Sequence, residues 1–129
     1  MKYLLIDTST PVCQMTLVDG TEHIEHTWDA GRTLAKNILG YIDETLSNAG
    51  LTYDDIDGLG VFRGPGSFTG LRIGLTVANT IASAQSLLIV GATGDEWQQQ
   101  SIDRLSRGES DTIILPEYGS DARITKPRK

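Results

Sequence analysis

The sequence predicts an α/β fold: a single lobe with a mixed five-stranded sheet and flanking helices, followed by a short C-terminal extension. Three strand patterns open the chain, and the rest alternates helices with strands in the order β-β-β-α-β-α-β. Strands joined by tight turns pair antiparallel, whereas strands separated by a helix run parallel through a crossover connection. The length of 129 residues, with 39% apolar and 22% charged residues, fits one domain with a modest core.

The first expected strand is residues 2–7, a continuous apolar run that ends in Asp7. Such a run is typical of a strand buried at the centre of a sheet. Residues 8–11, with the sequence TSTP, then turn the chain. At this position Asp7 can accept hydrogen bonds from the backbone of the turn, or it can take part in chemistry.

Residues 12–18 alternate between the two faces of a strand, which predicts a half-buried second strand. Asp19-Gly20 is a signal for a two-residue hairpin loop, and it predicts a third, edge-like strand over residues 21–28. The lone cysteine, Cys13, is expected in the core. One cysteine excludes an internal disulfide, and no run of residues is long and apolar enough to span a membrane, so we expect a cytoplasmic protein.

The pattern of residues 33–49 predicts the first helix, because at helical spacing the apolar and polar side chains fall on opposite faces. Gly50 is suited to end this helix, and a capping-box pattern at residues 52–55 predicts a short helical turn. The polar face carries Lys36, Asp43, Glu44 and Ser47. The expected buried face consists of Leu34, Ala35, Ile38, Leu39, Ile42, Leu46 and Ala49.

A glycine-rich loop follows an expected strand over residues 58–63 and opens a long helix over residues 67–86. Two glycines flank a proline, so the chain can turn sharply, and Ser67 is a natural N-cap. Such a loop can cradle an anion with backbone N–H groups. Alternatively, the glycines permit only a tight turn and close packing. The spacing favours this alternative, because G-x-G-x-x-x-G matches neither the dinucleotide-binding pattern nor the phosphate-loop pattern. The residues of the loop and its possible anion site are Asp7, Thr8, Ser9, Gly64, Gly66 and Ser67.

The helix over residues 67–86 is apolar or small almost all round. A surface helix needs an apolar stripe of only about 100°, so this helix is expected to be covered on two sides. One cover is the sheet; the other is either a layer of the same domain or a partner. The polar positions Arg72, Thr76, Asn79 and Ser83 fall on one narrow stripe. A row at spacing i, i+4, where another backbone could approach, comprises Gly70, Gly74, Ala78 and Ala82.

An apolar strand over residues 87–91 completes the sheet, and we expect the first domain to cover residues 1–92. Residues 93–129 are interpreted as a remnant of a second lobe and a basic tail, with a strand predicted at 112–115. The net charge of −6 argues against a nucleic-acid-binding body. The weak helical anchors of the polar stretch are Trp97, Ile102 and Leu105, and the basic residues of the tail are Arg123, Lys126, Arg128 and Lys129.

The candidate chemical groups do not combine into a convincing catalytic set. A metal-dependent nuclease needs several converging carboxylates, and Asp7 is well placed for one, with Glu44 at best a second. His23 and His26 are three apart on a strand, so they point to opposite faces and cannot chelate one metal together. The residues therefore favour a binding module, with a small actin-like nucleotide-binding protein or ATPase acting alone as the alternative.

The stretch RGPGSFTGLRIG (residues 63–74), the stretch LIDTST (residues 5–10) and the Asp19-Gly20 hairpin resemble the TsaB family, also called YeaZ. The resemblance covers residues 1 to about 92. It implies one lobe of the ASKHA type, the ribonuclease-H-like lobe shared by actin-like and sugar-kinase-like ATPases. It also implies a non-catalytic scaffold or dimerization subunit of bacterial threonylcarbamoyladenosine (t6A) synthesis, which modifies the tRNA adenosine next to the anticodon. Typical members carry a second lobe of similar size, whereas residues 93–129 can hold only a remnant.

The resemblance further implies a TsaD-like catalytic partner, a TsaE-like ATPase and a homodimer when the chain is alone, with tRNA contacted only indirectly and no membrane. No cofactor is expected beyond weak binding of ATP, ADP or Mg through the complex. Members of the family meet their partners through two helices, which correspond here to residues 33–49 and 67–86. The candidate partner-interface residues are Leu34, Ile38, Ile42, Gly70, Gly74, Val77, Ala78 and Ile81.

Overall fold

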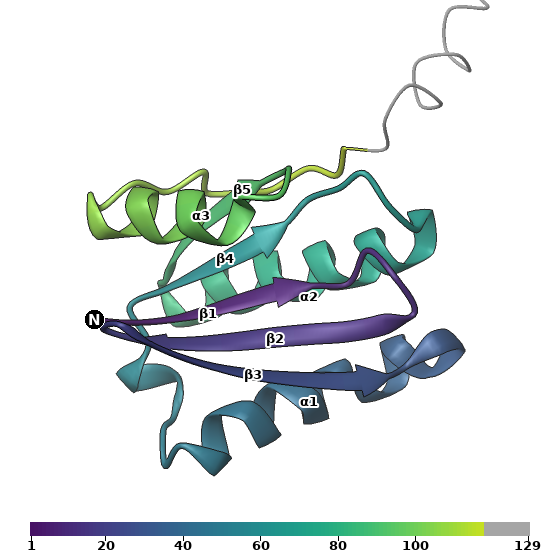
Figure 1. Cartoon of the computed structure of the whole chain (residues 1–129), viewed down its shortest axis with the longest axis horizontal. Helices are drawn as coiled ribbons and strands as arrows, with labels where there is room; N and C mark the ends of the chain where they lie inside the picture. Colours follow the sequence, from purple (N-terminus) through teal and green to yellow (C-terminus); the bar gives the residue numbers. More distant parts are fainter. Residues whose placement is uncertain (118–129) are drawn as a thin grey trace, which may run out of the picture.

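A mixed five-stranded sheet forms the centre of the protein, and the computed structural model describes residues 1–117 (Figure 1). The strand order is β3-β2-β1-β4-β5, with β1 antiparallel to β2 and parallel to β4. The strands are β1 (Lys2–Asp7), β2 (Val12–Asp19), β3 (Glu22–Asp29), β4 (Gly58–Phe62) and β5 (Leu88–Ala92). The helices are α1 (Leu34–Asn48), α2 (Phe68–Gln85) and α3 (Trp97–Ser106), with short 3-10 turns at Gly31–Thr33 and Tyr53–Asp55. The predicted fold class and the order β-β-β-α-β-α-β are confirmed.

The central strand β1 is buried on both faces, as its continuous apolar run predicts. Successive side chains of a strand point to opposite faces of the sheet. Leu4 and Ile6 therefore enter a large core that α1 and α2 cover, whereas Tyr3 and Leu5 enter a smaller core that α3 covers. Figure 1 shows α3 and α1 on opposite sides of the strands.

The β2–β3 hairpin forms where the sequence predicts it, but its loop is one position later than expected. Asp19 is the last residue of β2 and pairs with Glu22, so the two loop residues are Gly20 and Thr21. Gly20 adopts a φ of 63°, a conformation that favours glycine.

The helix boundaries and their capping residues agree with the predictions. Ser67 caps α2, since its Oγ accepts a hydrogen bond of 3.2 Å from the N–H of Gly70. Gly50 follows the end of α1 with a φ of 72°, and the capping box forms between Thr52 and Asp55. In the described part of the chain, no helix is long and apolar enough to cross a membrane.

The polar helix α3 packs against the sheet because two glycines of β4 leave room for it. A Cβ at Gly58 would lie 2.7 Å from the side chain of Leu105, and a Cβ at Gly60 would lie 2.8 Å from Cβ of Ser101. Ser101 is consequently buried, and its hydroxyl donates to the carbonyl of Trp97 one turn earlier at 2.8 Å. Because β4 has no side chains at these two glycines, α3 can lie close to its backbone and bury one face, although it has few apolar residues.

The strand predicted at residues 112–115 does not form. The backbone of this segment does not pair with β5. Instead, the side chains of Ser110 and Asp111, just before it, accept hydrogen bonds from backbone N–H groups of β5. The tail that carries Arg123, Lys126, Arg128 and Lys129 lies outside the described residues.

Candidate functional site: the glycine loop and the outer face of α1 and α2

The turn after β1 and the glycine loop after β4 meet at one end of the sheet. Because β1 and β4 are parallel neighbours, their carboxyl ends lie side by side. Asp7 Oδ1 accepts hydrogen bonds from the backbone N–H of Ser9 at 2.9 Å and from its hydroxyl at 2.7 Å. The N–H of Ser67 donates to the carbonyl of Ser9 at 2.7 Å. The structure therefore brings together the predicted loop residues from both segments.

The glycines at the start of α2 provide space for the Thr8-Ser9 turn of the same chain. A Cβ at Gly66 would lie 2.5 Å from Cβ of Ser9, and one at Gly70 would lie 2.3 Å from the carbonyl oxygen of Thr8. At Gly74 a Cβ would lie only 2.1 Å from Oγ1 of Thr8. These distances support the close-packing interpretation of the glycine motif.

The polar groups of this junction are bonded to one another. The hydroxyl of Thr8 is buried and donates to the carbonyl of Gly70 at 2.8 Å. The N–H groups of Ser67 and Gly70, which would face an anion at a helix N-terminus, already donate within the chain. These hydrogen bonds join the turn after β1 to the start of α2, and the anion site stays a prediction.

The remaining candidates for chemistry lie apart. His23 is exposed, while His26 lies on the opposite face of β3 and stacks on Trp28 with 5.9 Å between ring centroids. Burial, with a smaller contribution from the charge of Asp7, raises the pKa of the Cys13 thiol to about 11, so it is inert at neutral pH. Among residues 1–117, no three His, Cys, Asp or Glu side chains are grouped as metal ligands.

An apolar surface extends across the outer sides of α1 and α2. A hollow of about 390 Å³ lies between these helices. Phe68 at the start of α2 is 55% exposed, and the guanidinium of Arg72 lies 5.4 Å from its ring centroid. Leu39 on α1, one turn after Ala35, is 56% exposed. The residues that line the hollow are Ala35, Phe68, Thr69, Arg72, Ile73, Thr76 and Val77. We call this surface, together with Leu39, the α1–α2 outer face.

The candidate interface residues lie mostly in the core of the protein itself, because α2 turns its row of small residues toward the Thr8-Ser9 turn and the sheet. Val77 is half-buried and lines the hollow. The other seven are buried within the chain, so they present no surface to a partner, whereas Ala35, Leu39 and Phe68 on the same helices are exposed. The partner interface itself stays a prediction. The residues buried within the chain are Leu34, Ile38, Ile42, Gly70, Gly74, Ala78 and Ile81.

The sequence pattern predicts Ala35, Leu39 and Ala49 on the buried face of the first helix, but all three are exposed. Their spacing matches that of the core residues, and no pattern in the sequence separates them. Asn79 and Arg104 were also missed as structural contacts. Asn79 lies on the predicted polar stripe of α2, which is the one signal that could have drawn attention to it.

Comparison with known proteins places this geometry in context. A family model described as TsaD, tRNA N6-adenosine threonylcarbamoyltransferase, matches residues 28–93, about half of the chain. The chain is 36% identical to the tRNA threonylcarbamoyladenosine biosynthesis protein TsaB of Haemophilus influenzae over 123 residues, which make up 95% of this chain and 50% of the relative. The chain thus spans about half the length of the curated relatives that it matches.

Solved structures give the same picture. YeaZ from Pseudomonas aeruginosa matches with a TM-score of 0.68 at 27% identity, over 77% of this chain and 49% of that one. RuvC from Thermus thermophilus matches with a TM-score of 0.53 at 13% identity, over 95% of this chain and 87% of that one. The likeness to RuvC concerns the fold alone, and it agrees with a ribonuclease-H-like lobe.

Proposed function

The chain belongs to the TsaB/YeaZ family, within the wider TsaD family whose model it matches, and we propose that it is a non-catalytic scaffold subunit of tRNA threonylcarbamoyladenosine synthesis. In this role it binds and supports a TsaD-like catalytic subunit. The observation that carries the proposal is the α1–α2 outer face, where exposed apolar side chains from two helices border one hollow. Contiguous exposed apolar surface rimmed by polar residues marks sites of protein–protein contact.

The chemistry of that surface suits a helical partner. Leu39 and Phe68 are more than half exposed, and the half-buried side chains of Ile73 and Val77 line the hollow together with Phe68. Burial of a large apolar side chain contributes about 1.5–3 kcal/mol, so a few such residues suffice for specific binding. Arg72, already held over an aromatic ring, is of the residue type enriched at interfaces.

The glycine-loop junction supports a scaffold rather than a catalyst. Asp7 accepts hydrogen bonds from the N–H and the hydroxyl of Ser9, and the N–H groups of Ser67 and Gly70 donate within the chain. These are the groups that would contact a phosphate or a metal in an ATPase. Their present role is to join the turn to the helix.

The finer assignments are proposals at the same level. We propose a homodimer when the chain is alone, a TsaE-like ATPase as a further partner, indirect contact with tRNA, and no cofactor beyond weak ATP, ADP or Mg binding through the complex.

Light scattering after size exclusion tests the proposal, with the chain alone and mixed with the TsaD-like protein of the same organism. We expect a one-to-one complex, or a homodimer that gives way to it. A monomer that ignores the TsaD-like protein would overturn the scaffold role. Nucleotide binding by the isolated chain in calorimetry, together with that result, would favour an ATPase acting alone.

A further inference from the structure

The strand β5 lies at the edge of the sheet, and the segment after α3 covers its open side. We call residues 109–117 the strap. The N–H of Asp111 donates to the carbonyl of Ile89 at 2.7 Å. The hydroxyl of Ser110 accepts from the N–H of Ile89 at 3.1 Å, and Asp111 Oδ2 accepts from the N–H of Gly91 at 2.9 Å. Side-chain oxygens thus occupy positions that the carbonyls of a sixth strand would take, so the edge is blocked without a further strand.

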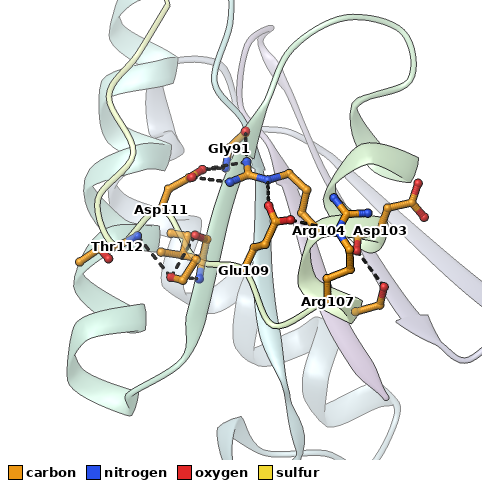
Figure 2. Close-up of polar contacts among 10 residues, drawn as sticks. Gly91, Asp103, Arg104, Arg107, Glu109, Asp111 and Thr112 are labelled. Atoms are coloured by element: carbon orange, nitrogen blue, oxygen red, sulfur yellow. Dashed lines mark hydrogen bonds and ion pairs between the residues drawn. The ribbon is translucent and has the colours of Figure 1, made fainter.

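An arginine of α3 fixes the first part of the strap (Figure 2). The guanidinium of Arg104 binds both carboxylate oxygens of Asp111, at 2.5 and 3.0 Å, and its Nε donates to Glu109 at 2.8 Å. Its Nη1 also donates to the carbonyl of Gly91 at 3.3 Å. Hydrogen bonds from Arg104 lower the pKa of both carboxyl groups, so the cluster is ionised at neutral pH. Arg107 contacts Glu109 alone among these residues, at 2.9 Å.

An asparagine of α2 fixes the middle of the strap. The side chain of Asn79 donates to the carbonyl of Ile114 at 3.0 Å and accepts from its N–H at 2.8 Å, as a neighbouring strand would. Ile114 is 3% exposed, whereas Ile113 and Leu115 on either side are 64% and 68% exposed. Its side chain packs over Gly91, where a Cβ would lie 2.7 Å away.

The end of the strap is bonded to the start of the glycine loop. Arg63 Nε donates to the carbonyl of Leu115 at 3.0 Å, and the carbonyl of Arg63 accepts from the N–H of Glu117 at 2.6 Å. A Cβ at Gly64, whose φ is 119°, would lie 2.0 Å from the carbonyl oxygen of Glu117. The first glycine of the motif therefore makes space for the strap, as the later ones make space for the Thr8-Ser9 turn.

We propose that the strap acts as a latch that closes the edge of β5 and holds the glycine loop in place. Three groups hold the strap: Asn79, Arg63 and the ion-pair cluster of Arg104. Asn79 and Arg63 bind main-chain atoms of the strap, whereas Arg104 binds its carboxylates. Opening the strap exposes the edge of β5 and loosens the loop that leads into α2. This inference does not depend on the proposed function, since it concerns contacts within one chain.

Hydrogen exchange with mass spectrometry tests the latch in the full chain, with Asn79→Ala as the variant and Thr80→Ala as its control. Thr80 is the next residue of α2, and within residues 1–117 its hydroxyl bonds only to its own helix, at the carbonyl of Thr76. Loss of two hydrogen bonds should speed exchange over residues 110–117 by about tenfold or more. The latch predicts that exchange over residues 63–67 rises with it, while β1, β2 and α1 are unchanged.

Faster exchange in the strap with an unchanged glycine loop would overturn the coupling. Unchanged exchange in the strap, or a uniform rise that includes β1 and β2, would overturn the latch itself. If Asn79→Ala does not fold, hydrogen exchange is compared between Arg104→Met as the variant and Arg107→Met as its control, and the same outcomes decide. Arg107 is a suitable control because it bonds to Glu109, whereas Arg104 also bonds to Asp111.

Discussion

Replacement of Gly74 by alanine tests whether the small residues of α2 pack against the chain's own turn. The new Cβ would lie 2.1 Å from Oγ1 and 2.9 Å from Cγ2 of Thr8, so the buried Thr8-Ser9 turn must move. Overpacking of this kind costs about 1–3 kcal/mol. Displacement of Thr8 also weakens its 2.8 Å hydrogen bond to the carbonyl of Gly70, worth about 1 kcal/mol. Alanine in place of glycine stabilises a helix by about 1 kcal/mol, so we expect the free energy of unfolding to fall by about 1–3 kcal/mol in total.

Gly40→Ala is the matched control, because Gly40 lies in α1, is exposed, and has nothing within 4 Å of the Cβ position. It should stabilise the protein by about 0.5–1 kcal/mol. Urea unfolding followed by the fluorescence of Trp28 and Trp97 measures both changes. In a Thr8→Ala background the Gly74→Ala change should cost at least about 1 kcal/mol less, because the clashing atoms are gone. Equal stability of the Gly74→Ala and Gly40→Ala proteins would refute the packing interpretation.

Three further predictions concern single side chains. Arg104 lowers the pKa of Asp111 below its usual 3.8, so its carboxylate stabilises the fold at neutral pH and loses that effect as the pH falls below about 4. The difference in unfolding free energy between wild type and Asp111→Asn should therefore be present at pH 7 and shrink at pH 3; a constant difference would contradict this. Alkylation of Cys13 by iodoacetamide at pH 8 should be on the order of a hundredfold slower in the folded protein than in urea, and similar rates would show that the thiol is accessible. Ser67→Ala should cost about 1 kcal/mol in urea unfolding and Ser67→Gly only a few tenths, and the cap has no such role if both are neutral.

The arrangement of strands and helices could be predicted because local patterns determine it. The buried run of β1, the hairpin signal at Asp19-Gly20 and the capping serine at position 67 each depend on neighbours in the sequence. Tight turns and crossover helices then restrict the order of the strands. The two sides of β1, with different cores, follow from strand alternation alone.

The candidate site could not be predicted to the same degree, because it depends on contacts between distant segments. Leu39 has the spacing of a core residue, and its exposure follows only from where α1 packs on the sheet. Gly74 has the spacing of a helix-contact residue, but the Thr8-Ser9 turn, which is more than sixty residues away in sequence, fills that space. Likewise, the strap replaces the strand predicted at 112–115 because Asn79 and Arg104 bind it from two helices.

Calorimetric titration with the TsaD-like protein of the same organism, for wild type and Leu39→Gln, measures whether the α1–α2 outer face binds that partner. Val12→Thr is the control, since Val12 is also an exposed apolar residue but lies at the start of β2. If the α1–α2 outer face binds the partner, Leu39→Gln should weaken the complex by about tenfold, or about 1.4 kcal/mol, and Val12→Thr should leave it unchanged. Equal affinities for Leu39→Gln and wild type would show that the partner binds elsewhere on the protein and that the outer face is not the interface.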